Sequence, residues 1–272
     1  MLNKGQLDGA PGVFVVISVF KLAREWEALD PGAQALAADE SRDSLCRSER
    51  QVAVEMYVTR GLKAQCDYFL RVRAHDLAEA QAFLQDFRST PLGCASQPVE
   101  TLVGMSKARQ YITAQRSEAL EQQLLAGSYQ DHDPVFAIVI PVKKSARWWN
   151  MPEAERCRGV ELHTQKSLPY LASVKRELYH STGLDDVDFI TYFEVADPKI
   201  FHELAVGLAA IPENEFHTRW GEPTLVGAIH SIPEALSRLC RHASTLVGSQ
   251  ELTVRCAGQG KTVRRIIRGT KR

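Results

Sequence analysis

Long hydrophobic runs are missing from this sequence of 272 residues, and no apolar stretch approaches the roughly 20 residues needed to span a bilayer. The first apolar run, residues 13–20, follows a weak basic lead at Lys4 and has no small-residue cleavage site after it. It predicts a strand rather than a signal peptide. Excess charge is missing too, because 33 Lys and Arg balance 33 Asp and Glu. This balance argues against nucleic acid or an anionic membrane as a partner.

Closely spaced cysteine and histidine motifs are also absent. Without C-x-x-C-H, covalent c-type haem is excluded by its usual motif, and without H-E-x-x-H or paired histidines nothing suggests zinc. The six cysteines lie far apart, at positions 46, 66, 94, 157, 240 and 256. Scattered thiols in a protein of this size favour a reducing compartment. We therefore expect a cytoplasmic location, with the periplasm as the alternative if a leader has been removed.

What the chain does contain is an internal repeat, offset by about 122 residues. Residues 13–106 read as strand, helix, strand, strand, helix, strand. Four short matches recur in register: VF at 13–14 and 135–136, E-M-Y-x-x-x-G-L at 55–62 and E-L-Y-x-x-x-G-L at 177–184, a strand ending in Asp at 67–76 and 188–197, and TLVG at 101–104 and 224–227. Four matches in one order predict a tandem duplication.

A β-α-β-β-α-β unit used twice predicts an α+β protein made of tandem duplicated ferredoxin-like domains, whose antiparallel sheets are covered by helices. A hydrophobic content of 44% supplies enough core for two modest domains. The aspartates that end the repeated strands, Asp76 and Asp197, are expected to cap the helices that follow. We place the parts at 1–112 (N-terminal domain), 113–133 (linker), 134–240 (C-terminal domain) and 241–272 (basic, flexible tail).

The repeat also places Arg176 on a strand, because this position aligns with Val54 in the second strand of the first half. Side chains alternate along a strand, so Val174, Arg176 and Leu178 point the same way. We expect helices to cover that face and the guanidinium to find a partner there, since burying an unpaired charge is costly.

His163 lies in a helical stretch that ends before Pro169, and that helix is expected to pack on the sheet. It can therefore face Arg176 across a gap. One imidazole with a cation on the far side suits a planar metal cofactor held by a single axial ligand, and the alternative is an ordinary core histidine. An axial histidine usually donates its other N–H to a carboxylate, for which Glu213 and Glu215 are candidates.

Residues 141–194, continued by PENEFHTRWGEPTLVGAIHS at 212–231, resemble the haem b chlorite dismutases of the long-chain branch. The resemblance is strong over about 134–231 and looser in the first half. It implies the tandem ferredoxin-like pair inferred above. It also implies one non-covalent haem b (iron protoporphyrin IX) per chain, in the C-terminal half only, and subunits assembled into homopentameric rings.

Carried over by position, the resemblance makes His163 the metal ligand, Glu213 its hydrogen-bond partner and Arg176 the catalytic arginine. The remaining haem-binding positions are Lys144 and Trp148 at the haem edge, Trp149 and Trp220 beside the pocket, and the pair Tyr111 and Ile112. For each aromatic residue, ordinary packing in the core or between subunits is the alternative.

The implied activity is that of an oxidoreductase-type haem enzyme, a chlorite O2-lyase, which converts chlorite to chloride and molecular oxygen. In the family's chemistry a ferryl haem forms, and Arg176 would hold the transient hypochlorite until it recombines. One alternative is a coprohaem decarboxylase or peroxidase-like member of the superfamily, in which glutamine usually stands at the position of Arg176. A second is a non-catalytic haem-binding protein. The arginine and the Trp148–Trp149 pair favour chlorite.

Overall fold

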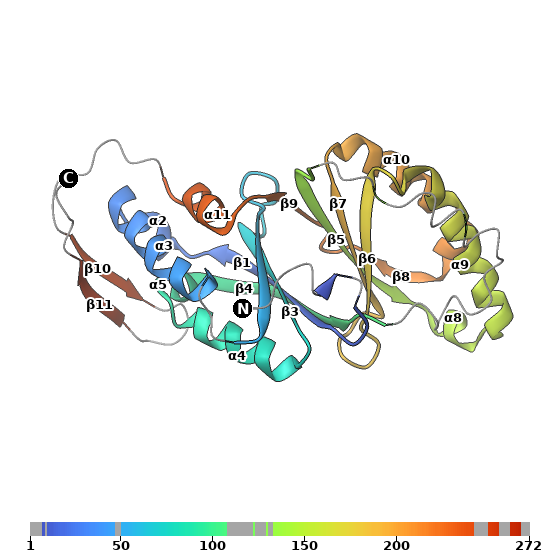
Figure 1. The fold of residues 1–272 in the computed structure, drawn as a ribbon, viewed down its shortest axis with the longest axis horizontal. Coiled ribbons are helices and arrows are strands. Elements are labelled where there is room, and N and C mark those ends of the chain that lie inside the picture. The colour runs from blue at the N-terminus through green and yellow to red at the C-terminus, as the bar shows by residue number, and fades with distance from the viewer. Residues whose placement is uncertain are drawn as a thin grey trace. The chain divides into compact units, whose positions relative to one another are not determined.

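The computed structural model describes residues 7–8, 10–46, 50–107, 122, 129 and 133–241, together with the backbone of 250–255 and 262–267 (Figure 1). Its contacts divide the chain into two compact units, the first built mainly from Phe14–Thr101 with Ile229–Arg272, and the second mainly from Leu102–Ala228. The described residues include no helix that is both long and apolar enough to cross a membrane.

The first unit is an antiparallel sheet with helices on one face. Its strands follow the order β4-β1-β3-β2, and the neighbours β1, β3 and β2 pair antiparallel. In chain order its elements are β1 (Phe14–Leu22), α2 (Arg24–Ala28), α3 (Pro31–Cys46), β2 (Val52–Val58), β3 (Tyr68–Ala74), α4 (Leu77–Arg88), α5 (Pro91–Cys94) and β4 (Ser96–Met105). Phe20 on β1 contacts both Tyr68 and Phe87, so the sheet and α4 share one aromatic core.

The second unit repeats this arrangement. Strand β5 pairs with β7 and β9, and β7 pairs with β6, which gives the order β9-β5-β7-β6 with the same connectivity as the first unit. Its elements are β5 (Phe136–Lys144), α8 (Ala146–Asn150), α9 (Glu153–Ser167), η1 (Leu168–Tyr170), β6 (Val174–His180), β7 (Phe189–Val195), α10 (Pro198–Ala209), η2 (Pro212–Phe216), β8 (His217–Trp220) and β9 (Leu225–Ile229). The predicted pair of ferredoxin-like units is confirmed.

The repeated aspartates explain why the repeated helices begin where they do. Asp76 accepts a hydrogen bond from the backbone N–H of Ala78 at 2.9 Å, and Asp197 accepts one from Lys199 at 2.9 Å. Each therefore satisfies one of the amide groups left without a partner at a helix start, as the sequence predicted.

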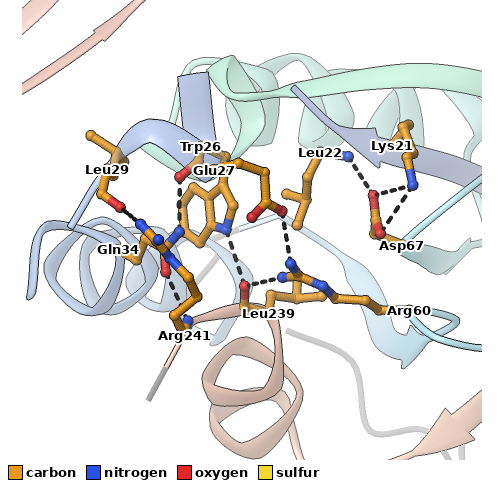
Figure 2. A network of polar contacts seen from close by, with 10 residues as sticks. All are labelled: Lys21, Leu22, Trp26, Glu27, Leu29, Gln34, Arg60, Asp67, Leu239 and Arg241. Atoms are coloured by element: carbon orange, nitrogen blue, oxygen red, sulfur yellow. Dashed lines mark hydrogen bonds and ion pairs between the residues drawn. The ribbon is translucent and has the colours of Figure 1, made fainter. Parts of the chain in front are cut away.

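Helix α11 (Ile232–Leu239) belongs to the first unit, although it follows the second in the chain. It packs against α3 and β2. In Figure 2 the carbonyl oxygen of Leu239 accepts hydrogen bonds from Nε1 of Trp26 at 3.1 Å and from the guanidinium of Arg60 at 2.8 Å. Gln34 receives the backbone N–H of Arg241 at 2.7 Å. The sequence had assigned residues up to 240 to the second domain, because periodicity does not show where a helix docks.

The sequence predicted that the basic segment 241–272 is a flexible tail, but part of it has regular structure. It contains β10 (Gln250–Arg255) and β11 (Thr262–Ile267), which pair antiparallel. Alternation in these two short runs, such as Leu252 with Val254, is a strand signal that the high content of basic residues had obscured.

Candidate functional site

A cavity of about 280 Å³, near the lower end of the range for small-molecule sites, lies within the second unit between its sheet and its helices. Figure 1 shows α8, α9 and α10 as an arc beside the strands of this unit. The lining is largely apolar and comes from β5, β6, β7, β8, α8, α9, α10 and η2, including Ile140, Val142, Trp148, Trp149, Cys157, Val160, Leu178, Phe189, Phe193, Phe201, Leu208 and Trp220. The polar side chains that also line it are Lys144, Glu153, Arg156, His163, Thr191, Glu213 and His217.

Helix α8 brings the two tryptophans of the sequence motif to this wall. Ser145 caps the helix by accepting a hydrogen bond from the N–H of Trp148 at 3.4 Å. Trp148 is buried and contacts Phe216 with ring centroids 5.7 Å apart, while Trp149 stacks on Phe189 at 6.2 Å. The tryptophans therefore belong both to the cavity wall and to the core behind it.

His163 lies on α9, on the cavity wall, with its side chain 39% exposed. Its Nδ1 atom lies 3.2 Å from Oε2 of Glu213, which is buried in η2. Glu215, the other carboxylate considered from the sequence, is exposed. Among the described residues Oε2 of Glu213 has no well-aligned hydrogen bond, so the imidazole N–H is its nearest donor. This contact leaves Nε2 of His163 as the ring nitrogen available to a ligand.

Lys144, at the end of β5, is buried beside the same carboxylate. Its Nζ lies 2.5 Å from Oε1 of Glu213 and 2.7 Å from Nε2 of His217, and it stands 4.3 Å above the ring of Trp148. Its backbone N–H donates to Asp188 at 2.7 Å, which fixes the strand end. The ammonium group therefore sits among an anion, a neutral acceptor and an aromatic face.

The charges of this group follow from burial and from these contacts. Burial raises the pKa of Glu213, but the adjacent imidazole of His163 and the charge of Lys144 outweigh it and lower that pKa to about 2. Burial lowers the pKa of Lys144 while Glu213 raises it, with a net decrease. Burial and the positive charge of Lys144 lower the pKa of His217 to about 4. At neutral pH Glu213 is a carboxylate and His217 is uncharged.

Gly159 allows α9 to approach Trp148 closely, one helical turn before His163. A Cβ atom at this position would lie 3.4 Å from the indole ring and 4.0 Å from Cγ of Glu213. A larger side chain would push the helix away from both, and His163 with it. No sequence pattern indicates this role, because a single glycine inside a helix belongs to no periodic pattern.

Arg176 lies on β6 as predicted, but the expectation that helices bury it is wrong, because the side chain is exposed. Its strand neighbour Leu178 and its cross-strand partner Phe193 both line the cavity, so Arg176 lies on the cavity face of the sheet. The face is open here because the cavity, rather than a packed helix, lies in front of it.

Trp220, the last predicted aromatic residue of this half, lines the cavity and is 41% exposed. Tyr111 and Ile112 lie outside the described residues. The sequence missed His217 and its neighbour Asn214, whose Oδ1 lies 2.6 Å from Nδ1 of His217. Their only sequence signal is position, since both follow Glu213 in the PENEFH segment.

Known proteins of similar sequence are consistent with a haem-binding site of this kind. The family model described as chlorite dismutase matches residues 34–229. The chain is 45% identical to a chlorite dismutase from Ideonella dechloratans over 238 residues, which cover 88% of this chain and 84% of that protein. It is 24% identical to a coproheme decarboxylase from Mycolicibacterium smegmatis over 83% of this chain and 94% of that protein.

Solved structures give the same picture. A mutant chlorite dismutase from Candidatus Nitrospira defluvii superposes with a TM-score of 0.83 at 34% identity, covering 88% of this chain and all of that one. A heme-binding protein from Thermus thermophilus superposes with a TM-score of 0.64 at 16% identity, over 84% of this chain and 95% of that one. The second likeness shows a shared fold alone.

Proposed function

The chain belongs to the chlorite dismutase family, and we propose that it is a haem b enzyme that decomposes chlorite to chloride and molecular oxygen. The observation that carries the proposal is the pairing of His163 with buried Glu213 on one wall of an apolar cavity. The strand face that bears Arg176 forms part of another wall. A fixed imidazole and a permanent cation are the two groups that such chemistry asks of the protein.

The residues present fit a haem. The buried Oε2 of Glu213 needs a donor, and an N–H on Nδ1 of His163 supplies it while leaving Nε2 to an iron ligand position. The described residues hold no group of three or more His, Cys, Asp and Glu side chains that could bind a metal ion directly. A single imidazole beside an apolar cavity suits a metal that brings its own macrocycle. We propose one haem b per chain, bound without covalent attachment.

A bound haem would supply the redox chemistry that breaks both Cl–O bonds of chlorite and joins the two oxygen atoms, so that ClO2⁻ becomes Cl⁻ and O2. Arg176 attracts the chlorite anion and retains the hypochlorite formed when the first oxygen atom is transferred. Glu213 holds His163 in one orientation and draws on its N–H, which makes the other ring nitrogen a stronger electron donor. The apolar lining and the tryptophans limit the water around the reacting anion.

Purified protein loaded with haem is expected to release one molecule of oxygen for each chlorite consumed, with chloride as the other product. An oxygen electrode and ion chromatography measure the two products. The matched control is the haem-free protein under the same conditions. Consumption of chlorite without oxygen, or oxygen release that does not depend on haem, would contradict the proposal.

Coprohaem decarboxylation is the less supported alternative, since identity falls from 45% with the chlorite dismutase to 24% with the decarboxylase. The same preparation tests it when it is incubated with iron coproporphyrin III and hydrogen peroxide. Formation of protoporphyrin haem would favour this second reaction. Haem binding without either reaction would leave a non-catalytic role.

We also propose that the subunits assemble into a homopentamer, as the resemblance implies. Leu162 on α9 and Val206 on α10 are 47% and 57% exposed, which gives each of the two adjoining helices of the second unit an apolar side chain in solvent. Light scattering is expected to give about five times the chain mass of 30.3 kDa. A monomer at micromolar concentration would contradict this assembly.

The cellular compartment has two competing proposals. Cys66, Cys157 and Cys240 carry free thiols, as is typical of the cytoplasm. Cys94 is disulfide-bonded, which is typical of an oxidising compartment such as the periplasm. Fractionation of cells that express the native gene decides between the two.

A further inference from the structure

We infer that His217 is a positioning residue for the iron ligand, an inference that rests on the function proposed above. His217 holds Lys144 against Glu213, and thereby sets the strength of the hydrogen bond that Glu213 accepts from the N–H of His163. The polar contacts form one line, which runs from Ala209 through Asn214, His217 and Lys144 to Glu213. The groups at its two ends determine which atom donates and which accepts in every hydrogen bond between them. Its remote end is the carbonyl oxygen of Ala209 at the end of α10, and its near end is Lys144 beside Glu213.

The remote end fixes the proton on His217. The carbonyl oxygen of Ala209 can only accept, so the atom of Asn214 that lies 3.2 Å from it must be the amide nitrogen. The other side-chain atom of Asn214 is therefore the oxygen, and it lies 2.6 Å from Nδ1 of His217. An oxygen acceptor requires a proton on Nδ1. Because His217 is uncharged at neutral pH, its Nε2 carries only a lone pair.

The near end leads to the same tautomer independently. The ammonium group of Lys144 can only donate, and Nε2 of His217 lies 2.7 Å from it. Lys144 thus has three placed partners, since Glu213 lies 2.5 Å away and the ring of Trp148 is 4.3 Å below. All three N–H groups of a buried ammonium are accounted for, and this keeps the side chain against Glu213.

Lys144 occupies Oε1 of Glu213, so only Oε2 faces His163. The ammonium group takes up part of the negative charge that would otherwise act on the imidazole. Without His217 one N–H of the buried ammonium would lack an acceptor, and we expect the side chain to shift toward another acceptor and away from Glu213. Glu213 would then accept a stronger hydrogen bond from the N–H of His163, which would give the iron ligand more imidazolate character.

The first test uses haem-free protein with ¹⁵N-labelled histidine. Two-bond ¹H–¹⁵N spectra at neutral pH are expected to show His217 with its proton on Nδ1. In Asn214→Leu, which removes the oxygen acceptor from the remote end, Lys144 still requires a lone pair on Nε2, so the Nδ1–H form should persist. A proton on Nε2 of His217 in the unaltered protein would overturn the inference, whatever the protein does with haem.

The second test uses haem-loaded protein. In His217→Phe the ferrous iron–histidine stretch is expected to move to higher frequency and the haem reduction potential to become more negative. His217→Gln is the matched control, because its amide oxygen can still accept from Lys144, and it should keep both values. If His217→Phe does not fold, His217→Leu, which also lacks an acceptor for Lys144, should show the same directions. Unchanged or opposite shifts would overturn the positioning role.

The two outcomes are separable from the proposed function. Oxygen release from chlorite with no spectroscopic effect of these substitutions would leave the function standing and remove the role of His217. The expected tautomer of His217 in a protein that binds no haem would support the hydrogen-bonded line and contradict the function.

Discussion

Replacement of His163 by alanine is expected to yield a folded protein that purifies largely without haem. The side chain lies at the cavity with Nδ1 held 3.2 Å from Glu213, so its loss removes the imidazole that this carboxylate orients. Outer-shell partners alone typically change metal affinity by about 10- to 100-fold, and loss of the ligand should cost at least the upper part of that range. Haem content per chain, from the pyridine haemochrome assay, measures the effect.

The control for this change is His202→Ala, because His202 is exposed on the neighbouring helix α10 and does not line the cavity. It should keep full haem content. The first unit offers no second site at the matching position, since Ser41 there is buried, donates to Ala37 at 2.7 Å and accepts from Leu92 at 3.0 Å. Full haem occupancy in His163→Ala would place the ligand on another residue.

Replacement of Arg176 by glutamine is expected to preserve haem binding and to lower the oxygen yield per chlorite. The side chain is exposed on the cavity face of β6, where it can meet an anion that enters the cavity. A hydrogen bond to a charged group contributes about 1.5–3 kcal/mol, which corresponds to a roughly ten- to hundredfold rise in escaping hypochlorite. A chlorination reporter such as monochlorodimedone traps the escaped anion.

Arg176→Lys separates charge from shape, because it keeps the positive charge but loses the planar pair of donors. We expect it to leak less hypochlorite than Arg176→Gln and more than the unaltered enzyme. Escaping hypochlorite should also oxidise Trp148 and end turnover early, which mass spectrometry of the recovered protein can detect. Equal trapping from all three proteins would remove Arg176 from the mechanism.

The sequence predicted the fold because its local signals agree with one another. Matched strands, the capping aspartates Asp76 and Asp197, and the 122-residue offset all indicate the same unit twice, and the sheets have that order. The predictions that the structure corrects concern which helices and strands pack against one another. The docking of α11 on the first unit depends on Trp26 and Arg60, which are more than 170 residues away in the chain, and no local pattern encodes such a contact.

The candidate site was predicted unevenly for a similar reason. His163 and Glu213 lie together as expected, since a ligand and its carboxylate partner carry recognisable side chains, whereas Lys144, expected at the haem edge, contacts the same carboxylate. The exposure of Arg176 was missed because alternation along a strand shows a face but not whether a helix or a cavity lies in front of it. Gly159 and His217 act through close approach and proton direction, which only coordinates reveal.

The hydrogen bonds received by Leu239 have a consequence for how the protein is made. The ribosome releases β1 through β4 early, but the helix that completes their core, α11, emerges only after the whole second unit. The second unit, which carries the cavity, is therefore inserted between two parts of the first. It can finish folding before α11, the last helix of the first unit, has been synthesised. Chains stalled near residue 228 should hold a protease-resistant second unit beside a digestible first one, and release past residue 241 should protect both.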